Sequence, residues 1–207
     1  RQRQMCIRDR IDVDTISQIA NDFSGVLLVD EAYVDFVDPA LRHDLLRLVN
    51  AFDNLLLLRT FSKGYSLAGL RLGYLIGSAA LIAPILSKTR DSYNVSHISQ
   101  QLGLAAINDR GYAQETWHEI RTARRTLRDA LIDLGLRVET SQSNFLLAEV
   151  PMDKPVSAAQ IYEGLKAEGI LVRFFDHPML EDKLRITVGT ATQNRRLIEA
   201  MKPLLGA

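Results

Sequence analysis

A lysine surrounded by hydroxyl and guanidinium side chains is the feature of this sequence best suited to chemistry. Lys63 follows the apolar run at residues 55–58, with Arg71 eight residues after it. Thr60 and Ser62 stand three residues and one residue before the lysine. Hydroxyls and guanidinium groups donate hydrogen bonds to phosphate oxygens, and a lysine amine attacks aldehydes. We therefore expect the lysine to bond to an aldehyde beside a phosphate that the other three side chains hold.

A second segment with side chains suited to chemistry lies at the end of the preceding predicted strand. The apolar run at residues 26–29 leads directly into Asp30, and Tyr33 follows. A carboxylate can keep a pyridine nitrogen protonated, which makes the ring a better electron sink, and a tyrosine can reach the ring oxygen. The two segments together predict a pyridoxal 5′-phosphate site in which Lys63 is catalytic and forms the Schiff base.

A purely structural explanation also exists for each of Lys63, Asp30 and Tyr33. An isolated lysine is by default a surface residue, but the hydroxyls and the arginine around Lys63 argue against that explanation here. An aspartate after a strand commonly closes a turn, as Asp30 could, and Tyr33 could lie at the edge of a core.

Three polar residues near the end of the chain are candidates for binding the substrate. Arg173 and Arg185 each lie among apolar neighbours in a predicted strand, and a buried arginine needs an anionic partner. The anion would be part of the substrate or, equally well on the sequence pattern, a structural carboxylate such as Asp176 or Glu181. Asn144 precedes another strand, either as a turn residue or as a substrate contact.

The apolar periodicity predicts an α/β fold of the doubly wound kind, in which ligands bind at the carboxyl ends of strands. The sequence pattern changes at Gly135 from long helices to short strands and helices, and this change predicts a smaller α+β layer after it. Strands are expected at residues 26–29, 55–58, 70–76, 137–140, 145–150, 170–174 and 184–188. Helices are expected at residues 14–21, 42–49, 78–86, 96–108, 112–134, 158–168 and 192–205. Asp14 is the expected cap of the first helix. The arginines of the long helix are expected on a solvated face: Arg121, Arg124, Arg125 and Arg128.

The bulk composition narrows the class of protein. The 207 residues include 25 basic and 25 acidic side chains, so nothing points to a nucleic-acid or membrane partner. The single cysteine forms no intramolecular disulfide and fits a reducing compartment, so we expect a cytoplasmic protein. The four histidines have no metal-ligand spacing, and no metal site is predicted.

The first ten residues, RQRQMCIRDR, have neither periodicity nor capping residues. We interpret residues 1–10 as a non-native leader, with a basic surface segment as the alternative. The remaining chain divides at Gly135 into residues 11–134 and a small C-terminal domain at residues 135–207.

Four stretches resemble the fold-type I, class I/II pyridoxal-phosphate-dependent aminotransferases: VDEAY from residue 29, RTFSK from 59, LAGLRLGY from 67 and LRITVGT from 184. The ILVR stretch from residue 170, with LRITVGT, narrows the resemblance to the histidinol-phosphate aminotransferase subfamily. The resemblance implies a large cofactor-binding domain, with a mostly parallel sheet and helices on both faces, followed by a small C-terminal domain.

The resemblance also implies a reaction. Histidinol phosphate, a phosphorylated amino alcohol, and 2-oxoglutarate would become imidazole-acetol phosphate and glutamate, a step of histidine biosynthesis. Arg173 and Arg185 would suit a substrate with a phosphate where an amino acid has its carboxylate. Members of the family are homodimers, and the partner subunit contributes a tyrosine to the site.

This sequence departs from the family pattern at its start. The glycine-rich turn, the aromatic residue that stacks on the ring and the Asn-Pro-x-x-Pro-Thr-Gly stretch do not occur in it. We therefore expect a C-terminal fragment with little or no activity by itself. A threonine-phosphate decarboxylase, an aromatic aminotransferase and a non-catalytic domain derived from such an enzyme remain alternatives.

Overall fold

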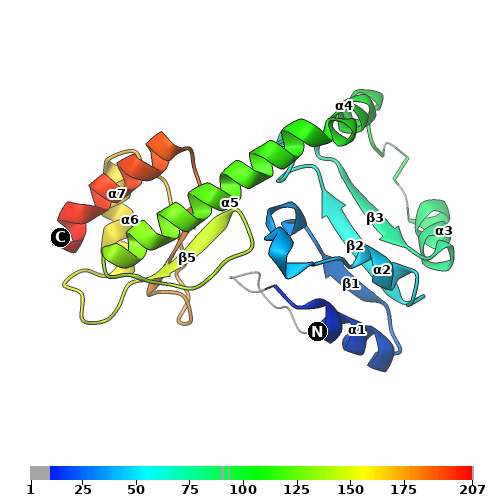
Figure 1. Ribbon diagram of the computed structural model, residues 1–207, viewed down its shortest axis with the longest axis horizontal. Helices are drawn as coiled ribbons and strands as arrows, with labels where there is room; N and C mark the ends of the chain where they lie inside the picture. Colours follow the sequence, from blue (N-terminus) through cyan, green and yellow to red (C-terminus); the bar gives the residue numbers. More distant parts are fainter. Residues whose placement is uncertain (1–9, 90, 93, 207) are drawn as a thin grey trace. The chain divides into compact units, whose positions relative to one another are not determined.

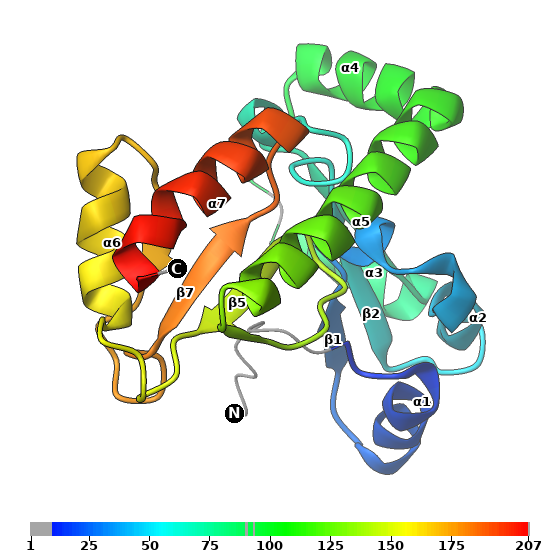
Figure 2. The same cartoon turned by 60° about the vertical axis from the view of Figure 1, so that its left-hand side comes forward.

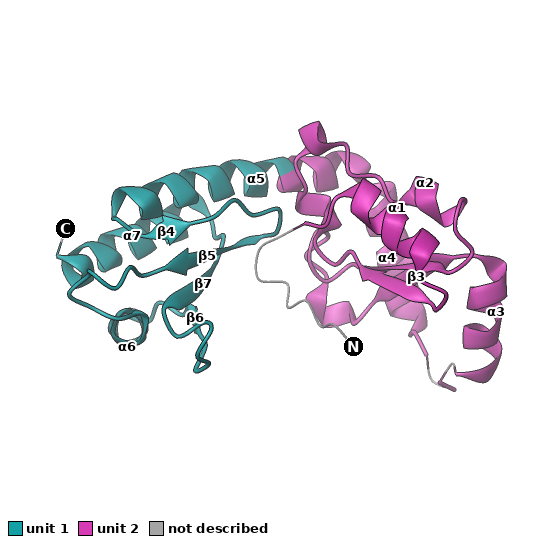
Figure 3. Ribbon diagram, turned by 90° about the horizontal axis from the view of Figure 1, so that it is seen from below, with its two compact units in different colours: residues 1–9, 118–207 teal, residues 10–117 magenta. Residues whose placement is uncertain are grey.

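The computed structural model describes residues 10–89, 91–92 and 94–206, which form two compact units (Figure 3). The N-terminal unit comprises Arg10–Trp117, and the described part of the C-terminal unit begins at His118. The division falls inside helix α5 (Arg110–Asp133). The expected domain boundary near Gly135 stays a prediction. Apart from Arg10, the proposed leader lies outside the described residues.

A three-stranded sheet organises the N-terminal unit (Figure 1). Strand β1 (Leu27–Asp30) runs parallel to β2 (Leu55–Thr60), and β2 pairs antiparallel with β3 (Gly73–Gly77). The described strands thus combine one parallel and one antiparallel pair, whereas a mostly parallel sheet was expected for the large domain. Because β1 and β2 are parallel, their carboxyl ends meet at one edge of the sheet.

One face of this sheet packs against helix α1 (Val13–Asp22) and the segment that leads into α2 (Leu46–Val49). Leu55 and Leu57 of β2 are fully buried there, with Ile16 of α1 and with Leu45. These strand residues lie two apart, which is the period that places side chains on one face of a strand. The packing holds β2 in place, and β2 leads directly to Lys63.

Three expected elements of the N-terminal unit differ clearly from those observed, and in the C-terminal unit the strands expected at residues 137–140 and 170–174 are limited to two residues each. Asp12, not Asp14, caps α1, because its carboxylate accepts the Thr15 amide at 2.8 Å. Helix α2 is far shorter than residues 42–49, since Arg42 adopts a left-handed conformation with φ of 47°. Strand β3 begins only at Gly73, because the preceding residues form a 3-10 helix.

The other helices of the N-terminal unit follow the sequence expectation closely. Helix α3 begins after Ser78 and α4 after Ser96, whose hydroxyl accepts the Ser99 amide at 3.1 Å. Their bounds are Ala79–Lys88 for α3 and His97–Asn108 for α4. Short 3-10 helices span Val34–Phe36, Pro39–Leu41 and Ala68–Leu70. None of the described helices combines the length and apolarity needed to cross a membrane.

The C-terminal unit is an antiparallel sheet of order β4-β5-β7-β6, with helices packed on it (Figure 2). The strands are Arg137–Val138, Phe145–Glu149, Lys183–Thr187 and Arg173–Phe174, in that spatial order. Helices α6 (Ala158–Ala167) and α7 (Ala191–Leu205) lie side by side, and both begin with a capping box. With the N-terminal unit, this establishes the expected α/β class.

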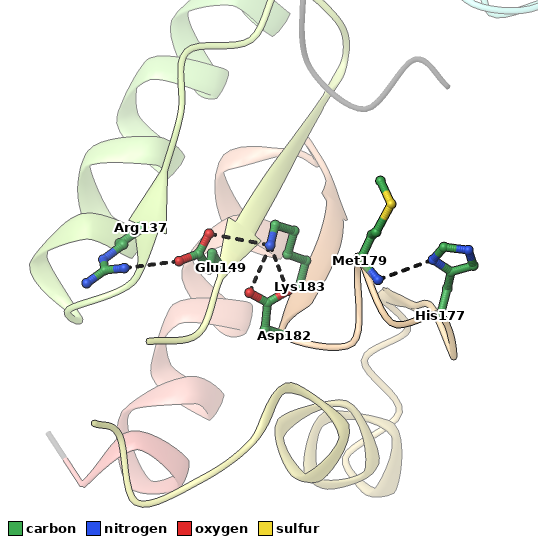
Figure 4. Close-up of polar contacts among 6 residues, drawn as sticks. All are labelled: Arg137, Glu149, His177, Met179, Asp182 and Lys183. Atoms are coloured by element: carbon green, nitrogen blue, oxygen red, sulfur yellow. Dashed lines mark hydrogen bonds and ion pairs between the residues drawn. The ribbon is translucent and has the colours of Figure 1, made fainter. Parts of the chain in front are cut away.

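The two faces of the C-terminal sheet differ in polarity. Leu146 of β5 and Leu184 and Ile186 of β7 are buried in one core with residues of α5, α6 and α7. Charged side chains lie on the other face: Lys183 lies 3.4 Å from Glu149, which accepts a hydrogen bond from Arg137 at 3.2 Å (Figure 4). One face of this sheet therefore supplies the core, and the other presents polar side chains, including those of the expected substrate arginines.

Candidate functional site

The carboxyl ends of β1 and β2 bring the expected lysine and tyrosine together. The Lys63 ammonium lies 5.8 Å from the centre of the Tyr33 ring. Asp30 is the last residue of β1, opposite Leu58 of β2, and its side chain is exposed. One carboxylate oxygen of Asp30 accepts the Ala32 amide at 2.9 Å. Asp30 therefore closes the turn that carries Tyr33, as its structural explanation required, and remains at the same edge as Lys63.

Internal hydrogen bonds hold the loop between β2 and β3, residues 61–72. The Phe61 amide donates to the Leu72 carbonyl at 3.1 Å, and the Leu67 amide donates to the Phe61 carbonyl at 3.0 Å. The Thr60 hydroxyl accepts the Ser62 amide at 3.0 Å and donates to the Leu72 carbonyl at 3.3 Å. The Thr60 hydroxyl thus ties the loop in this structure, in addition to its expected role in holding a phosphate.

Two residues of this loop adopt left-handed backbone conformations. Ser66 has a φ of 57° and Arg71 a φ of 51°, values that residues other than glycine adopt only at a cost. Arg71 also donates from its guanidinium to the Ala68 carbonyl at 3.1 Å, which uses one of its five N–H donors. Unusual backbone geometry of this kind tends to gather at functional sites. Here it occurs in the loop that carries Lys63.

An aromatic cluster supports the loop from α5. The Trp117 indole donates to the Gly64 carbonyl at 2.7 Å, and its ring meets Tyr65 edge-on at a centroid distance of 5.6 Å. Phe61 packs against Tyr65 and Tyr74, at 5.0 and 5.6 Å. The sequence interpretation did not include Trp117, although it is the single tryptophan of the chain. Its hydrogen bond fixes the residue that follows Lys63.

The N-terminal unit also contains a buried charged cluster, formed by Glu31, Arg59 and His43. Glu31 is 5% exposed, and its Oε2 accepts from Nε of Arg59 at 2.8 Å. The other oxygen, Oε1, is 3.4 Å from Nε2 of His43 but has no hydrogen-bond partner among the described residues. Arg10 contacts Nδ1 of His43 at 3.0 Å. Since a guanidinium only donates, Nδ1 must accept and Nε2 carries the ring proton toward Glu31.

Asp35 completes this cluster. Burial raises the pKa of the Asp35 carboxyl to about 6, while the positive charge of Arg59 lowers it and the negative charge of Glu31 raises it. The pKa of Tyr65 is raised as well, first by burial and then by the charge of Asp35. The sequence interpretation missed Glu31, Asp35 and Arg59. The only signal was their position within the two segments that carry Tyr33 and Lys63.

The expected substrate residues of the C-terminal unit also come together. Arg173 and Arg185 are direct cross-strand partners. The guanidinium of Arg185 lies over the rings of Phe145 and Phe175, at 5.2 and 5.9 Å, and that of Arg173 lies over Phe175 at 5.3 Å. Within the described part of the chain, neither arginine pairs with a carboxylate. The structural alternative, an ion pair with Asp176 or Glu181, is therefore not formed.

The arginines of the long helix are not uniformly solvated, contrary to the expectation. Arg124 is 5% exposed and donates to the Ser143 carbonyl at 2.6 Å. The turn around Ser143 is further held by Ser141, whose hydroxyl donates to the Phe145 carbonyl at 2.8 Å. Asn144 lies in this turn, and its carbonyl accepts the Val188 amide at 2.9 Å. Arg124 thus positions the turn that carries Asn144.

The expected site residues fall into one group in each unit. Asp30, Tyr33 and Lys63 gather with the loop of residues 61–72 in the N-terminal unit. Arg173 and Arg185 meet across two strands of the C-terminal unit. A lysine beside a tyrosine and a carboxylate, and separately a pair of arginines, are side-chain types that amino-group transfer uses.

The sequence matches a known family of enzymes. Residues 8–201 match the family of class I and II aminotransferases, so the chain belongs to this family. It is 44% identical over 192 residues to histidinol-phosphate aminotransferase 1 of a Nostoc species, covering 93% of this chain and 52% of the relative. It is 40% identical over 196 residues to histidinol-phosphate aminotransferase of Microcystis aeruginosa, covering 95% and 54%. The chain thus spans about half the length of these curated relatives.

A solved structure shares the fold. It is histidinol-phosphate aminotransferase of Sinorhizobium meliloti in complex with pyridoxal-5′-phosphate. The TM-score is 0.86 at 24% sequence identity, over 97% of this chain and 54% of that one. This structure confirms the fold, and the family match over residues 8–201 confirms the predicted aminotransferase family.

Proposed function

We propose that this chain supplies the catalytic lysine and the substrate arginines of a pyridoxal-phosphate-dependent aminotransferase that acts on histidinol phosphate and 2-oxoglutarate, as its curated relatives' names suggest. The observation that carries the proposal is the position of Lys63 beside Tyr33 at the shared carboxyl edge of β1 and β2, where Asp30 ends its strand. In open α/β sheets this edge is where ligands bind.

The side chains at this edge fit the cofactor. Pyridoxal phosphate supplies, when bound, a pyridine ring that accepts the electrons of the substrate carbon during amino-group exchange. Lys63 is exposed, so its amine can reach an aldehyde and afterwards carry a proton. Asp30 would pair with a ring nitrogen, and Tyr33 would bond a ring oxygen. Ser62, Thr60 and Arg71 would hold the phosphate.

The cross-strand pair of arginines supports a phosphorylated amine as the substrate. Two like charges directly across a pair of strands repel one another, and here no described carboxylate neutralises them. A doubly charged phosphate would relieve that repulsion more than a carboxylate would, and arginine forks suit its oxygens. We assign Arg173 and Arg185 to the substrate anion, with Asn144 as a further contact.

The wider architecture belongs to the same proposal. The N-terminal unit would form part of a large cofactor domain with a mostly parallel sheet and helices on both faces. The C-terminal unit would contain the small α+β domain. The functional assembly would be a cytoplasmic homodimer, as the family resemblance implies.

An absorbance experiment tests the role of Lys63. Pyridoxal phosphate added to the chain should give a new visible band, and borohydride reduction should attach the cofactor to Lys63, as found by mass mapping. Lys63→Ala should abolish both the band and the attachment. Lys88→Ala, which removes a lysine at the end of α3, should leave them unchanged. Attachment of the cofactor at another lysine would contradict the proposal.

Substrate comparison separates the enzyme alternatives. In the complete enzyme that contains this segment, histidinol phosphate should bind more tightly than threonine phosphate and phenylalanine, and it should exchange its amino group without loss of carbon dioxide. Release of carbon dioxide from threonine phosphate would favour a decarboxylase instead. Preference for phenylalanine would favour an aromatic aminotransferase.

A further inference from the structure

Phe175 contacts both arginines of the cross-strand pair. The guanidinium of Arg173 lies 5.3 Å from the centre of the Phe175 ring, and that of Arg185 lies 5.9 Å from it. At these distances the negative face of an aromatic ring attracts a cation. Because Arg173 and Arg185 are direct cross-strand partners, a single ring contacts two like charges that would otherwise only repel each other.

The position of Phe175 is fixed by the strand before it and the turn after it. Phe174 packs on the core face of the sheet, where its ring stacks on Tyr162 at 5.9 Å, so strand alternation directs Phe175 to the opposite face. The Phe175 carbonyl accepts the His177 amide at 2.9 Å. The same turn ends at Leu180, whose side chain is buried and whose amide donates to the His177 carbonyl at 2.8 Å.

The ring contacts leave the hydrogen-bond donors of the arginines unused. A guanidinium has five N–H donors in its plane, and an aromatic ring attracts its charge without accepting those hydrogens as a carboxylate would. Among the described residues, none accepts a hydrogen bond from Arg173 or Arg185. Glu149, a carboxylate on this face of the sheet, lies 3.2 Å from Arg137 and 3.4 Å from Lys183 instead. The donors of the arginine pair therefore remain available to an anion.

We propose that Phe175 is a positioning residue for the substrate anion, because its ring holds the guanidiniums of Arg173 and Arg185 together so that both donate to one phosphate group. This inference rests on the proposed function and deepens it. The ring makes no hydrogen bond to the phosphate. It orders two long side chains before binding, and each such side chain that must be ordered during binding weakens affinity by about 2- to 10-fold.

Nuclear magnetic resonance of the full chain tests the ring contacts before any ligand is added. Each arginine gives an Nε–H signal in a ¹H–¹⁵N spectrum, and Arg173→Lys and Arg185→Lys identify the two signals by their absence. Phe175→Leu keeps an apolar side chain but removes the ring current, so both signals should move. Phe175→Tyr retains the ring and should leave both signals near their original positions. Unmoved signals in Phe175→Leu would overturn the proposal.

Titration with inorganic phosphate at constant ionic strength tests the effect on binding. Both arginine signals of the unsubstituted chain should shift with one common midpoint, since one phosphate contacts both side chains. Phe175→Leu should raise this midpoint by about 10-fold, because two arginine side chains must then be ordered during binding. Phe175→Tyr should restore the original midpoint. Phe174→Leu, the same replacement at the neighbouring position on the core face, should leave it unchanged.

The possible results separate this inference from the proposed function. An unchanged midpoint in Phe175→Leu, or an equal loss in Phe175→Tyr or Phe174→Leu, would overturn the positioning role. Two different midpoints would also overturn it, since each arginine would then bind phosphate alone. If neither arginine signal of the unsubstituted chain responds to phosphate, the substrate assignment of the pair is contradicted. The signals of the free chain would still decide whether the Phe175 ring holds the two guanidiniums.

Discussion

At the scale of single residues, the raised pKa of Asp35 has a consequence for stability. The carboxyl has a pKa of about 6 in the folded chain, against an ordinary value of 3.8. Between these values the folded state holds a proton that the unfolded state has released, so stability falls as pH rises through this window.

Asp35→Asn should therefore stabilise the chain at neutral pH. The gain is at most about 3 kcal/mol above pH 6, because about two pKa units correspond to about 1.4 kcal/mol each. It should vanish below about pH 4, where the carboxyl is protonated in both states. Urea unfolding across this range, with Asp53→Asn as control, measures the difference. A less stable Asp35→Asn chain at pH 7 would show that the charged form is well solvated.

Arg185 allows a second prediction about a single side chain. Arg185→Gln should weaken the binding of histidinol phosphate by about 10- to 100-fold, since a hydrogen bond to a charged group contributes about 1.5–3 kcal/mol. Titration calorimetry measures the loss. Arg137→Gln removes an exposed arginine of the same sheet and should leave binding unchanged. Equal losses in both variants would indicate a general charge effect instead of a site.

At the scale of elements, helix caps show how local sequence defines a boundary. The Thr190 hydroxyl accepts the Gln193 amide at 3.3 Å, and the Gln193 side chain accepts the Thr190 amide at 2.9 Å. This reciprocal capping box begins α7 directly after the LRITVGT stretch.

Replacing this cap should weaken the C-terminal unit. Thr190→Ala should lower the free energy of unfolding by about 1 kcal/mol, the usual value for a lost N-terminal cap. Thr192→Ala, an exposed position inside the helix, should change it by no more than about 0.5 kcal/mol. Denaturant unfolding followed by circular dichroism compares the two variants. The reverse order would mean that α7 begins elsewhere in solution.

Element boundaries were predicted where local chemistry controls them and missed where it does not. Ser78 and Ser96 precede α3 and α4, as the helical periodicity indicated. The expected helix at residues 42–49 failed because Arg42 turns into the left-handed region, a conformation that the apolar spacing does not reveal. The same limitation hid Arg71 and therefore the true start of β3.

At the scale of the whole molecule, the described residues form two separate hydrophobic cores. Leu55 and Leu57 belong to the core of the N-terminal unit, whereas Leu146 and Leu184 belong to that of the C-terminal unit. The two clusters share no residue. We therefore expect each core to respond separately to a cavity.

Matched core truncations test this expectation. Leu57→Ala and Leu146→Ala remove fully buried side chains and should each cost about 2–5 kcal/mol. Leu57→Ala should shift the unfolding transition seen by Trp117 fluorescence, because Trp117 packs in the N-terminal unit. Leu146→Ala should leave that transition in place and shift only part of the circular dichroism signal. Coincident transitions for both probes in both variants would show instead that the chain unfolds as one unit.

The sequence alone determined which residues stand at the ends of β1 and β2. Asp30, Tyr33 and Lys63 lie close to strand ends in their own segments, so apolar runs and residue types were enough to select them. Tertiary structure alone decided how their surroundings are charged and braced. Glu31 meets Arg59 across 28 residues, and Trp117 meets Gly64 across 53. Contacts of this range depend on how whole elements pack, which no local pattern encodes.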